Sequence, residues 1–322
     1  MKILILKLYI EILFHLYYTV LEGVVKMLEN LATEERNEKT IDLDTLSPKE
    51  ILAVMNEEDL TVPIAIKKVL PQIELIVSGV ISCFQKGGRL IYLGAGTSGR
   101  LGVLDAAECV PTFGVSKEQV IGLIAGGEKA FVAAIEGAED SKILGENDLK
   151  QIKLTANDFV IGIAASGRTP YVIGALDYAK SVGAKTGAIS CNANAKISAH
   201  ADIAVEVVTG AEILTGSTRL KAGTAQKLVL NMISTASMVG IGKVYKNLMV
   251  DVLPTNKKLE ERSKRIIMEA TEADYETANK FYEAAEKHVK VAIVMILTNS
   301  TKEIALEKLS EAKGFVRNTI QK

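Results

Sequence analysis

Several residue types are scarce in this 322-residue chain. It has no tryptophan, aromatic residues make up 5%, and there are 6 prolines. Its three cysteines, Cys83, Cys109 and Cys191, are widely spaced and form no CxxC pair, which argues against a disulfide framework and a zinc site. With 38 basic and 39 acidic residues the net charge is −1, so the overall electrostatic field does not favour binding of nucleic acid. We therefore expect a cytoplasmic protein with no nucleic-acid partner.

A long uncharged hydrophobic run is also missing. Residues 1–26 are the most apolar stretch, but Lys7, Glu11, His15 and Glu22 interrupt it, so it suits neither a membrane helix nor a signal peptide. Two interpretations remain for this leader: an amphipathic helix, or an artefact of a start site placed upstream of Met27. Folding and activity of a chain begun at Met27 would separate them. No membrane association is expected.

What the chain does contain is an alternation of short apolar runs and helical windows. The runs predict buried parallel strands, and the windows between them predict helices that cover both faces of the sheet. Expected strands are 89–93, 120–124, 158–164, 186–190 and 203–208; expected helices are 61–85, 99–110, 128–144, 169–182, 222–241 and 257–272. The fold class is α/β, a doubly wound parallel sheet of about five strands with a C-terminal helical appendage. We expect a leader at 1–26, a main domain at 27–262 with its core at 80–243, and a helical subdomain at 263–322.

The sharpest local motif is the segment GAGTSGR, residues 94–100, directly after the first expected strand and at the start of a helix. Glycines let the backbone approach an anion, and the amides of a helix N-terminus point toward it. The segment also fits GxGxxG, but the second strand runs into Ala125 and two glycines, where a dinucleotide site needs an acidic residue. We therefore expect a phosphate monoester site, with a ligand-free tight turn as the alternative. Its expected phosphate-binding residues are Gly96, Thr97, Ser98 and Gly99, with Arg100 as a further substrate contact.

A second segment of the same chemistry, ASGRTP, residues 165–170, follows the third expected strand. Loops at the carboxyl ends of strands flanking the switch point of a doubly wound sheet open into one crevice. Ser166, Gly167 and Thr169 should therefore bind the same phosphate. Ser190 and Asn192 end the fourth strand at the same edge, where they either contact the substrate or cap a turn.

These motifs carry a family resemblance. The two loops on an alternating α/β core resemble the sugar isomerase (SIS) domain, a flavodoxin-like phosphosugar-binding fold. Residues 210–227, GAEILTGSTRLKAGTAQK, resemble a signature shared by glucokinase regulatory proteins and bacterial N-acetylmuramic acid 6-phosphate etherases. The segments TSGRLGVLDAAECVP at 97–111, EGAED at 136–140 and LENLATEERN at 28–37 are similar to the etherases themselves.

The resemblance implies a homodimeric enzyme without metal or cofactor. Such an enzyme cleaves the lactyl ether of N-acetylmuramic acid 6-phosphate, a small phosphosugar, to N-acetylglucosamine 6-phosphate and D-lactate during cell-wall recycling. It also implies that Glu108 transfers protons and that Glu139 assists. Arg219 and Lys221 are candidates to neutralise the phosphate or the lactyl carboxylate, or are surface cations.

The residues themselves are compatible with this chemistry. Glu108 stands among Leu104, Ala107 and Cys109, where burial would raise the pKa of a carboxyl into the range of a general acid or base. Glu139 lies in an acid-rich stretch that, without the resemblance, is typical of a solvated helix face. The three histidines are too scattered to suggest a metal site or a triad. A phosphosugar isomerase and a non-catalytic phosphosugar sensor remain the alternative functions.

Overall fold

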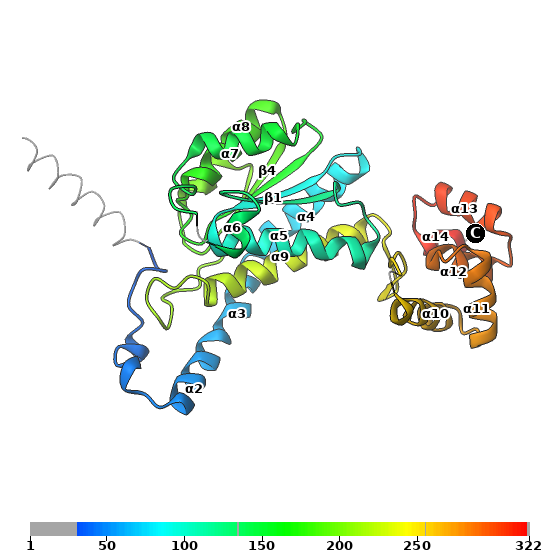
Figure 1. The fold of residues 1–322 in the computed structure, drawn as a ribbon, viewed down its shortest axis with the longest axis horizontal. Coiled ribbons are helices and arrows are strands. Elements are labelled where there is room, and N and C mark those ends of the chain that lie inside the picture. Colours follow the sequence, from blue (N-terminus) through cyan, green and yellow to red (C-terminus); the bar gives the residue numbers. More distant parts are fainter. Residues whose placement is uncertain (1–30, 134, 255, 321–322) are drawn as a thin grey trace, which may run out of the picture.

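The structure, a computed structural model, describes residues 31–133, 135–254 and 256–320. Its centre is a sheet covered by helices (Figure 1). The strands of this sheet are parallel and lie in the order β2-β1-β3-β4-β5. The strands are β1 (Leu90–Gly94), β2 (Val120–Ile124), β3 (Phe159–Ile163), β4 (Lys185–Ser190) and β5 (Ile203–Glu206). This is the flavodoxin-like order, with its switch point between β1 and β3. The predicted α/β fold class and the five strand positions are confirmed.

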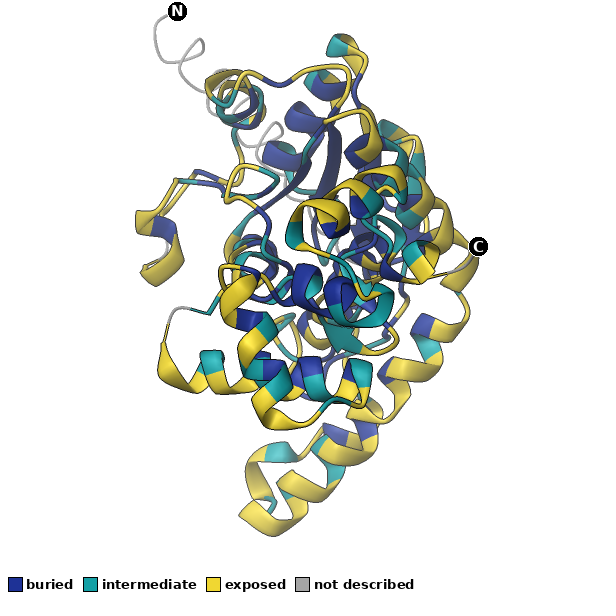
Figure 2. Ribbon diagram, turned by 90° about the vertical axis from the view of Figure 1, so that its right-hand side faces the viewer, coloured by how far each residue is buried: buried dark blue, intermediate teal, exposed yellow. Residues whose placement is uncertain are grey.

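Both faces of the sheet are buried, which explains why the strands read as continuous apolar runs. Alternate side chains along β1 face opposite sides: Leu90 and Tyr92 belong to one apolar cluster, Ile91 and Leu93 to another. The first cluster packs against α4 (Leu70–Gln85), α5 (Gly96–Phe113) and α9 (Lys221–Gly240), the second against α7 (Lys142–Gln151) and α8 (Pro170–Val182). In Figure 2 the buried residues concentrate on the strands and on the helix sides that face them.

Three helix predictions need correction. The expected helix 61–85 is two helices, α3 (Thr61–Lys67) and α4, because Val69 leaves the helical conformation just before Pro71. The expected helix 128–144 is only a short α6 (Lys129–Val132) followed by irregular chain up to the start of α7, since Gly137 has a left-handed backbone and scattered polar residues leave no continuous apolar face. The helix predicted to stop before Pro111 continues to Phe113 and ends at Gly114, whose φ is 61°.

An N-terminal arm precedes the sheet. Two 3₁₀ turns, η1 (Glu38–Thr40) and η2 (Leu43–Thr45), lead to α2 (Pro48–Asp59). Ser47 and Glu50 form a reciprocal capping box at the start of α2, as the sequence Ser-Pro-Lys-Glu favours. In Figure 1 the arm projects from the α/β core, with α2 at its far end and α3 returning toward α9.

The chain after α9 forms a helical subdomain with its own apolar core. A small hairpin of β6 (Val244–Tyr245) and β7 (Leu248–Met249), which the sequence did not reveal, leads into five helices. These are α10 (Lys257–Thr271), α11 (Tyr275–Ala284), α12 (Val289–Thr298), α13 (Lys302–Glu311) and α14 (Val316–Ile320). Lys290 fastens this subdomain to the segment after α9, donating to the carbonyl oxygen of Gly242 and pairing with Asp251.

The predicted leader, residues 1–26, lies outside the described residues. Within the described part of the chain, no helix is both long and apolar enough to cross a bilayer. All three cysteines are buried and free. Burial raises the pKa of Cys83 and of Cys109 to about 12, so both thiols stay protonated at neutral pH.

Candidate functional site

The two glycine loops meet at one edge of the sheet. Gly94, the last residue of β1, is paired with Ile163, the last residue of β3. Both loops therefore leave the carboxyl ends of neighbouring strands at the switch point, where doubly wound folds bind ligands. The expectation that both loops leave the same edge of the sheet is confirmed; that they bind one ligand there stays a prediction.

The first loop presents backbone amides. Helix α5 begins at Gly96, so the N–H groups of its first turn have no carbonyl partner within the helix. Gly99 packs against the strand end: a Cβ there would lie 2.5 Å from the carbonyl oxygen of Gly94. Ser98 faces inward, and its hydroxyl donates to Oε1 of Gln226 at 3.0 Å. Ser98 can therefore offer a phosphate its amide, while Thr97 is half-buried and Gly96 is exposed.

The second loop is held by a glycine with left-handed backbone. Gly167 has φ 68°, and a Cβ on it would lie 2.3 Å from Cβ of Ala195. Only glycine fits such a position. Ser166 and Thr169 are half-buried on either side, and Thr169 is the N-cap residue of α8. The first turn of α8 therefore faces the same edge as the first turn of α5.

Ser190 and Asn192 are buried and engaged within the protein. The Ser190 hydroxyl donates to the carbonyl oxygen of Asn192 at 3.1 Å. The Asn192 amide donates to Thr33 Oγ1 at 2.9 Å and to the carbonyl oxygen of Ala165 at 3.0 Å. The structure thus gives both residues the turn-stabilising partners that were the alternative to substrate contact.

A cavity of about 250 Å³ lies beside the first loop, between α5 and the chain around α6. Its lining includes Gly96, Arg100, Glu136 and Glu139. Arg100 shapes this wall, because Nε donates to the carbonyl oxygen of Phe131 and Nη2 to that of Ala130, each at 2.8 Å. Glu139, whose sequence context suggested a solvated helix, therefore lies on an irregular segment that borders the phosphate loop.

Glu108 is placed elsewhere. It is exposed, as are Leu104 and Ala107, so the expectation that apolar neighbours bury its carboxyl is wrong for the single chain. Twelve residues separate it from Gly96 on one continuous helix, about 18 Å along the axis at 1.5 Å per residue. Glu139 therefore borders the cavity beside Gly96, whereas Glu108 lies far along α5 from that cavity.

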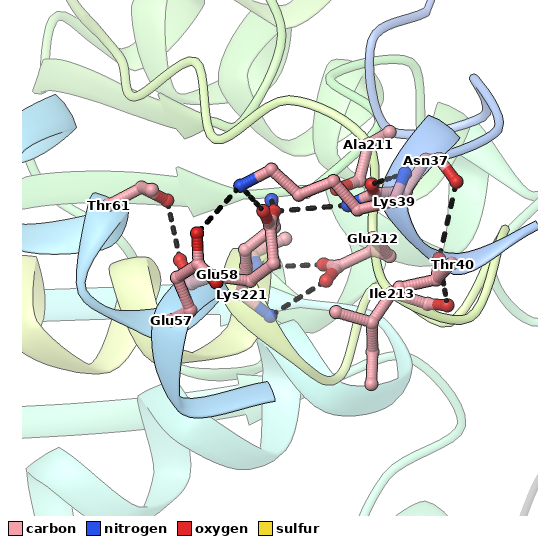
Figure 3. Close-up of polar contacts among 11 residues, drawn as sticks. Asn37, Lys39, Thr40, Glu57, Glu58, Thr61, Ala211, Glu212, Ile213 and Lys221 are labelled. Atoms are coloured by element: carbon pink, nitrogen blue, oxygen red, sulfur yellow. Dashed lines mark hydrogen bonds and ion pairs between the residues drawn. The ribbon is translucent and has the colours of Figure 1, made fainter. Parts of the chain in front are cut away.

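Of the two candidate cations, Arg219 is exposed and Lys221 is buried. Nζ of Lys221 pairs with Oε2 of Glu58 at 2.7 Å, and the backbone amide of Lys221 donates to Glu212 at 2.9 Å (Figure 3). Burial alone would raise the pKa of Glu58, but hydrogen bonds from Lys221 and Lys39 outweigh it and hold the pKa below its ordinary value. Lys221 is therefore committed to an internal ion pair rather than free for an anion.

Sequence reasoning missed the acidic partners in this cluster. Glu212 falls inside the signature segment, but it stands nine residues before α9, too far ahead to be recognised from sequence as a capping residue. Glu58 gave no signal, because it lies among the acids at the end of α2 and its partner is 163 residues away. Burial raises the pKa of Glu212 above its ordinary value, against the lowering effect of the Ala222 and Lys221 amides.

Another buried acid lies between α5 and α9. Asp105 accepts a hydrogen bond from the Ser234 hydroxyl at 3.1 Å, and burial raises the pKa of its carboxyl. Across the described ranges, no group of three histidine, cysteine or acidic side chains is arranged to hold a metal ion.

Comparison with known proteins identifies the family. Sequence models match for the glucokinase regulatory protein N-terminal SIS domain at residues 72–180 and for the SIS domain at 148–236. The chain is 83% identical over 296 residues to an N-acetylmuramic acid 6-phosphate etherase of Listeria welshimeri, covering 92% of this chain and 100% of that relative. The chain belongs to the N-acetylmuramic acid 6-phosphate etherase family.

A second etherase, from a Geobacillus species, is 67% identical over 295 residues, again 92% of this chain and 100% of the relative. Among solved structures, a phosphoheptose isomerase from Francisella tularensis is similar with a TM-score of 0.46 and 13% identity, over 60% of this chain and 100% of that one. The family resemblance seen in the motifs is thus confirmed along almost the whole chain.

Proposed function

We propose that this chain cleaves the D-lactyl ether of N-acetylmuramic acid 6-phosphate, giving N-acetylglucosamine 6-phosphate and D-lactate, in the recycling of cell-wall amino sugars. The carrying observation is the 83% identity to an etherase over that relative's full length. The two loops at the β1/β3 switch point support it, since a crevice lined by amides of two helix N-termini suits a terminal phosphate.

The chemistry follows from the poor leaving ability of an alkoxide. Opening of the sugar ring gives an aldehyde at C1, which makes the proton on C2 acidic. A carboxylate removes that proton, the C3–O bond breaks, and an acid protonates the departing lactate oxygen. Water then adds to C3 of the double bond and a proton returns to C2. The net result is hydrolysis, with the ether oxygen leaving in lactate.

The proposed phosphate contacts are the loop residues Gly96, Thr97, Ser98, Gly99, Ser166, Gly167 and Thr169. Glu139 is one proposed acid–base group, because it borders the cavity next to Gly96. Glu108 is the other, on the strength of its motif. Arg100 acts in this proposal by holding the chain around Phe131, which leads to Glu139.

The position of Glu108 supports a homodimer. Leu104 on α5 and Met232 and Val239 on α9 are 48%, 39% and 45% exposed, an apolar surface on two helices that pack side by side. In the proposed dimer two chains join at this surface, and Glu108 of one chain approaches the loops of its partner. On its own chain Glu108 is twelve residues along α5 from Gly96. The site then needs both subunits. Because the three cysteines are free and the proposed substrate is a phosphosugar, we place the protein in the cytoplasm.

The testing experiment is incubation with N-acetylmuramic acid 6-phosphate and an assay for D-lactate. The proposal requires equimolar D-lactate and N-acetylglucosamine 6-phosphate. Interconversion of aldose and ketose phosphates without lactate would indicate an isomerase instead. Binding without turnover would indicate a phosphosugar sensor.

A further inference from the structure

A buried ion pair lies behind the phosphate crevice and is not explained by substrate chemistry. Nζ of Lys221, the first residue of α9, lies 2.7 Å from Oε2 of Glu58 near the end of α2. The two side chains are only 4% and 8% exposed. Burying two charges is costly unless their surroundings are well organised, so the pair demands a reason.

Glu58 also fastens the N-terminal strap, which we define as residues 31–40. Its carboxylate accepts from Nδ2 of Asn37 at 3.0 Å and pairs with Nζ of Lys39 at 3.0 Å (Figure 3). In the same strap, the Thr40 hydroxyl donates to the carbonyl oxygen of Ile213 at 2.9 Å. Glu58 therefore joins the strap to Lys221 at the start of α9, and Thr40 joins it to the segment 210–220 that leads into α9.

At its other end the strap reaches the second phosphate loop. The Thr33 hydroxyl accepts from the Asn192 amide, which also donates to the carbonyl oxygen of Ala165. Ala165 precedes Ser166 in that loop. The strap thus spans the crevice side from the 210–220 segment to the ASGRTP loop.

Lys221 connects the same cluster to the first phosphate loop. Its backbone amide and that of Ala222 donate to the Glu212 carboxylate, both at 2.9 Å, which fixes the start of α9. Two residues on, a Cβ at Gly223 would lie 3.5 Å from Cγ2 of Thr97. One turn further, Gln226 accepts from the Ser98 hydroxyl. The first turns of α9 therefore pack directly on the loop expected to hold the phosphate.

We propose that Glu58 and Lys221 are positioning residues for the phosphosugar crevice: their ion pair sets the register of α9 against Thr97 and Ser98, and holds the strap over the second loop. Neither side chain touches the substrate in this role. The inference rests on the proposed function for the identity of the substrate. Its effect on phosphate binding can be measured without turnover.

Removing the Glu58 charge leaves the Lys221 ammonium buried without its ion-pair partner, and removing Lys221 leaves the buried Glu58 with Lys39 alone. We expect the start of α9 to shift in either case, because the shift relieves the buried charge. A shift there displaces the loop amides from the phosphate. Binding should therefore weaken more than the chemical step slows: we expect Glu58→Gln and Lys221→Met to raise KM about tenfold while kcat changes about twofold or less. Lys221→Arg, which keeps a cation for Glu58, should recover most of the lost affinity.

The matched control is Asp158→Asn. It breaks another ion pair with a buried carboxylate, Arg89–Asp158 at 2.7 Å, at the amino end of the sheet and away from the crevice. All variants are assayed for D-lactate release, unfolding by denaturant, and binding of inorganic phosphate by calorimetry, at a temperature where each is folded. At a similar loss of stability, Glu58→Gln and Lys221→Met should have a phosphate dissociation constant about tenfold higher than that of Asp158→Asn.

The inference would be overturned if Glu58→Gln and Asp158→Asn weakened phosphate binding and raised KM equally at the same loss of stability. The same holds if Lys221→Arg recovers stability but not affinity. If the wild type releases no D-lactate, the proposed function fails, but the phosphate measurements still decide the positioning role.

Discussion

Nε of Arg100 donates a 2.8 Å hydrogen bond to the carbonyl oxygen of Phe131, and Nη2 binds the neighbouring carbonyl of Ala130. One side chain at the phosphate loop thus holds the segment that leads to Glu139. The first prediction concerns Arg100→Lys, which keeps the charge but cannot reach both carbonyls in this fork geometry. We expect kcat to fall roughly 10- to 100-fold with little loss of stability. Faster amide hydrogen exchange across 126–139 would accompany it, and unchanged exchange with unchanged kcat would refute the link.

The second prediction concerns the division of the two acids between subunits. Glu108→Gln and Glu139→Gln should each lower kcat by roughly 10² to 10⁴ while phosphate binding persists. Glu136→Gln, in the same cavity wall, is the matched control and should lose little.

If the acids of one site come from different chains, mixing the two inactive variants restores one intact site in each mixed dimer. About a quarter of wild-type activity should then return after subunit exchange. No recovery, in a mixture shown to contain mixed dimers, would assign both acids to one chain.

The third prediction uses two glycines with similar backbone. Gly167 (φ 68°) and Gly210 (φ 71°) both lie in the left-handed region, but a Cβ meets Ala195 only at Gly167, and nothing lies within 4 Å at Gly210. Gly210→Ala should cost roughly 1–2 kcal/mol of unfolding free energy for its backbone alone. Gly167→Ala should cost more than that and should also weaken phosphate binding. Equal losses in the two denaturant curves would argue against a tight second loop.

The fourth prediction concerns Asp105. Because burial raises its pKa in the folded protein, the folded state binds more protons than the unfolded state, and this residue reduces stability as pH rises above its ordinary value of 3.8. Asp105→Asn should therefore increase the free energy of unfolding at pH 7, with a gain that shrinks as the pH falls toward 3.8. Denaturant unfolding at several pH values measures it. A loss of stability at pH 7 that shrinks as the pH falls would show that the folded state favours the charged form instead.

The sequence predicted much of the α/β core because its signals are local. Each strand is a buried apolar run, and the loop at 94–100 combines a strand end, glycines and a helix start within seven residues. The pairing of Gly94 with Ile163 followed from the alternation of strands and helices, since doubly wound topology places both loops at one edge.

What failed depends on contacts distant in sequence. In the 128–144 segment, Arg100, about 30 residues earlier, donates to the carbonyl oxygens of Ala130 and Phe131, a contact that no local pattern shows. The roles of Lys221 and Asn192 depend on Glu58 and Thr33, each more than 150 residues away. The exposure of Glu108 could not be read from its apolar neighbours, since Leu104 and Ala107 are exposed with it.

The most direct test of the proposed activity follows the oxygen atoms. N-acetylmuramic acid 6-phosphate is incubated with the enzyme in H₂¹⁸O, and the products are analysed by mass spectrometry. Elimination followed by hydration predicts ¹⁸O at C3 of N-acetylglucosamine 6-phosphate and ordinary oxygen in the lactate hydroxyl. Label in the lactate hydroxyl, or no lactate at all, would contradict it.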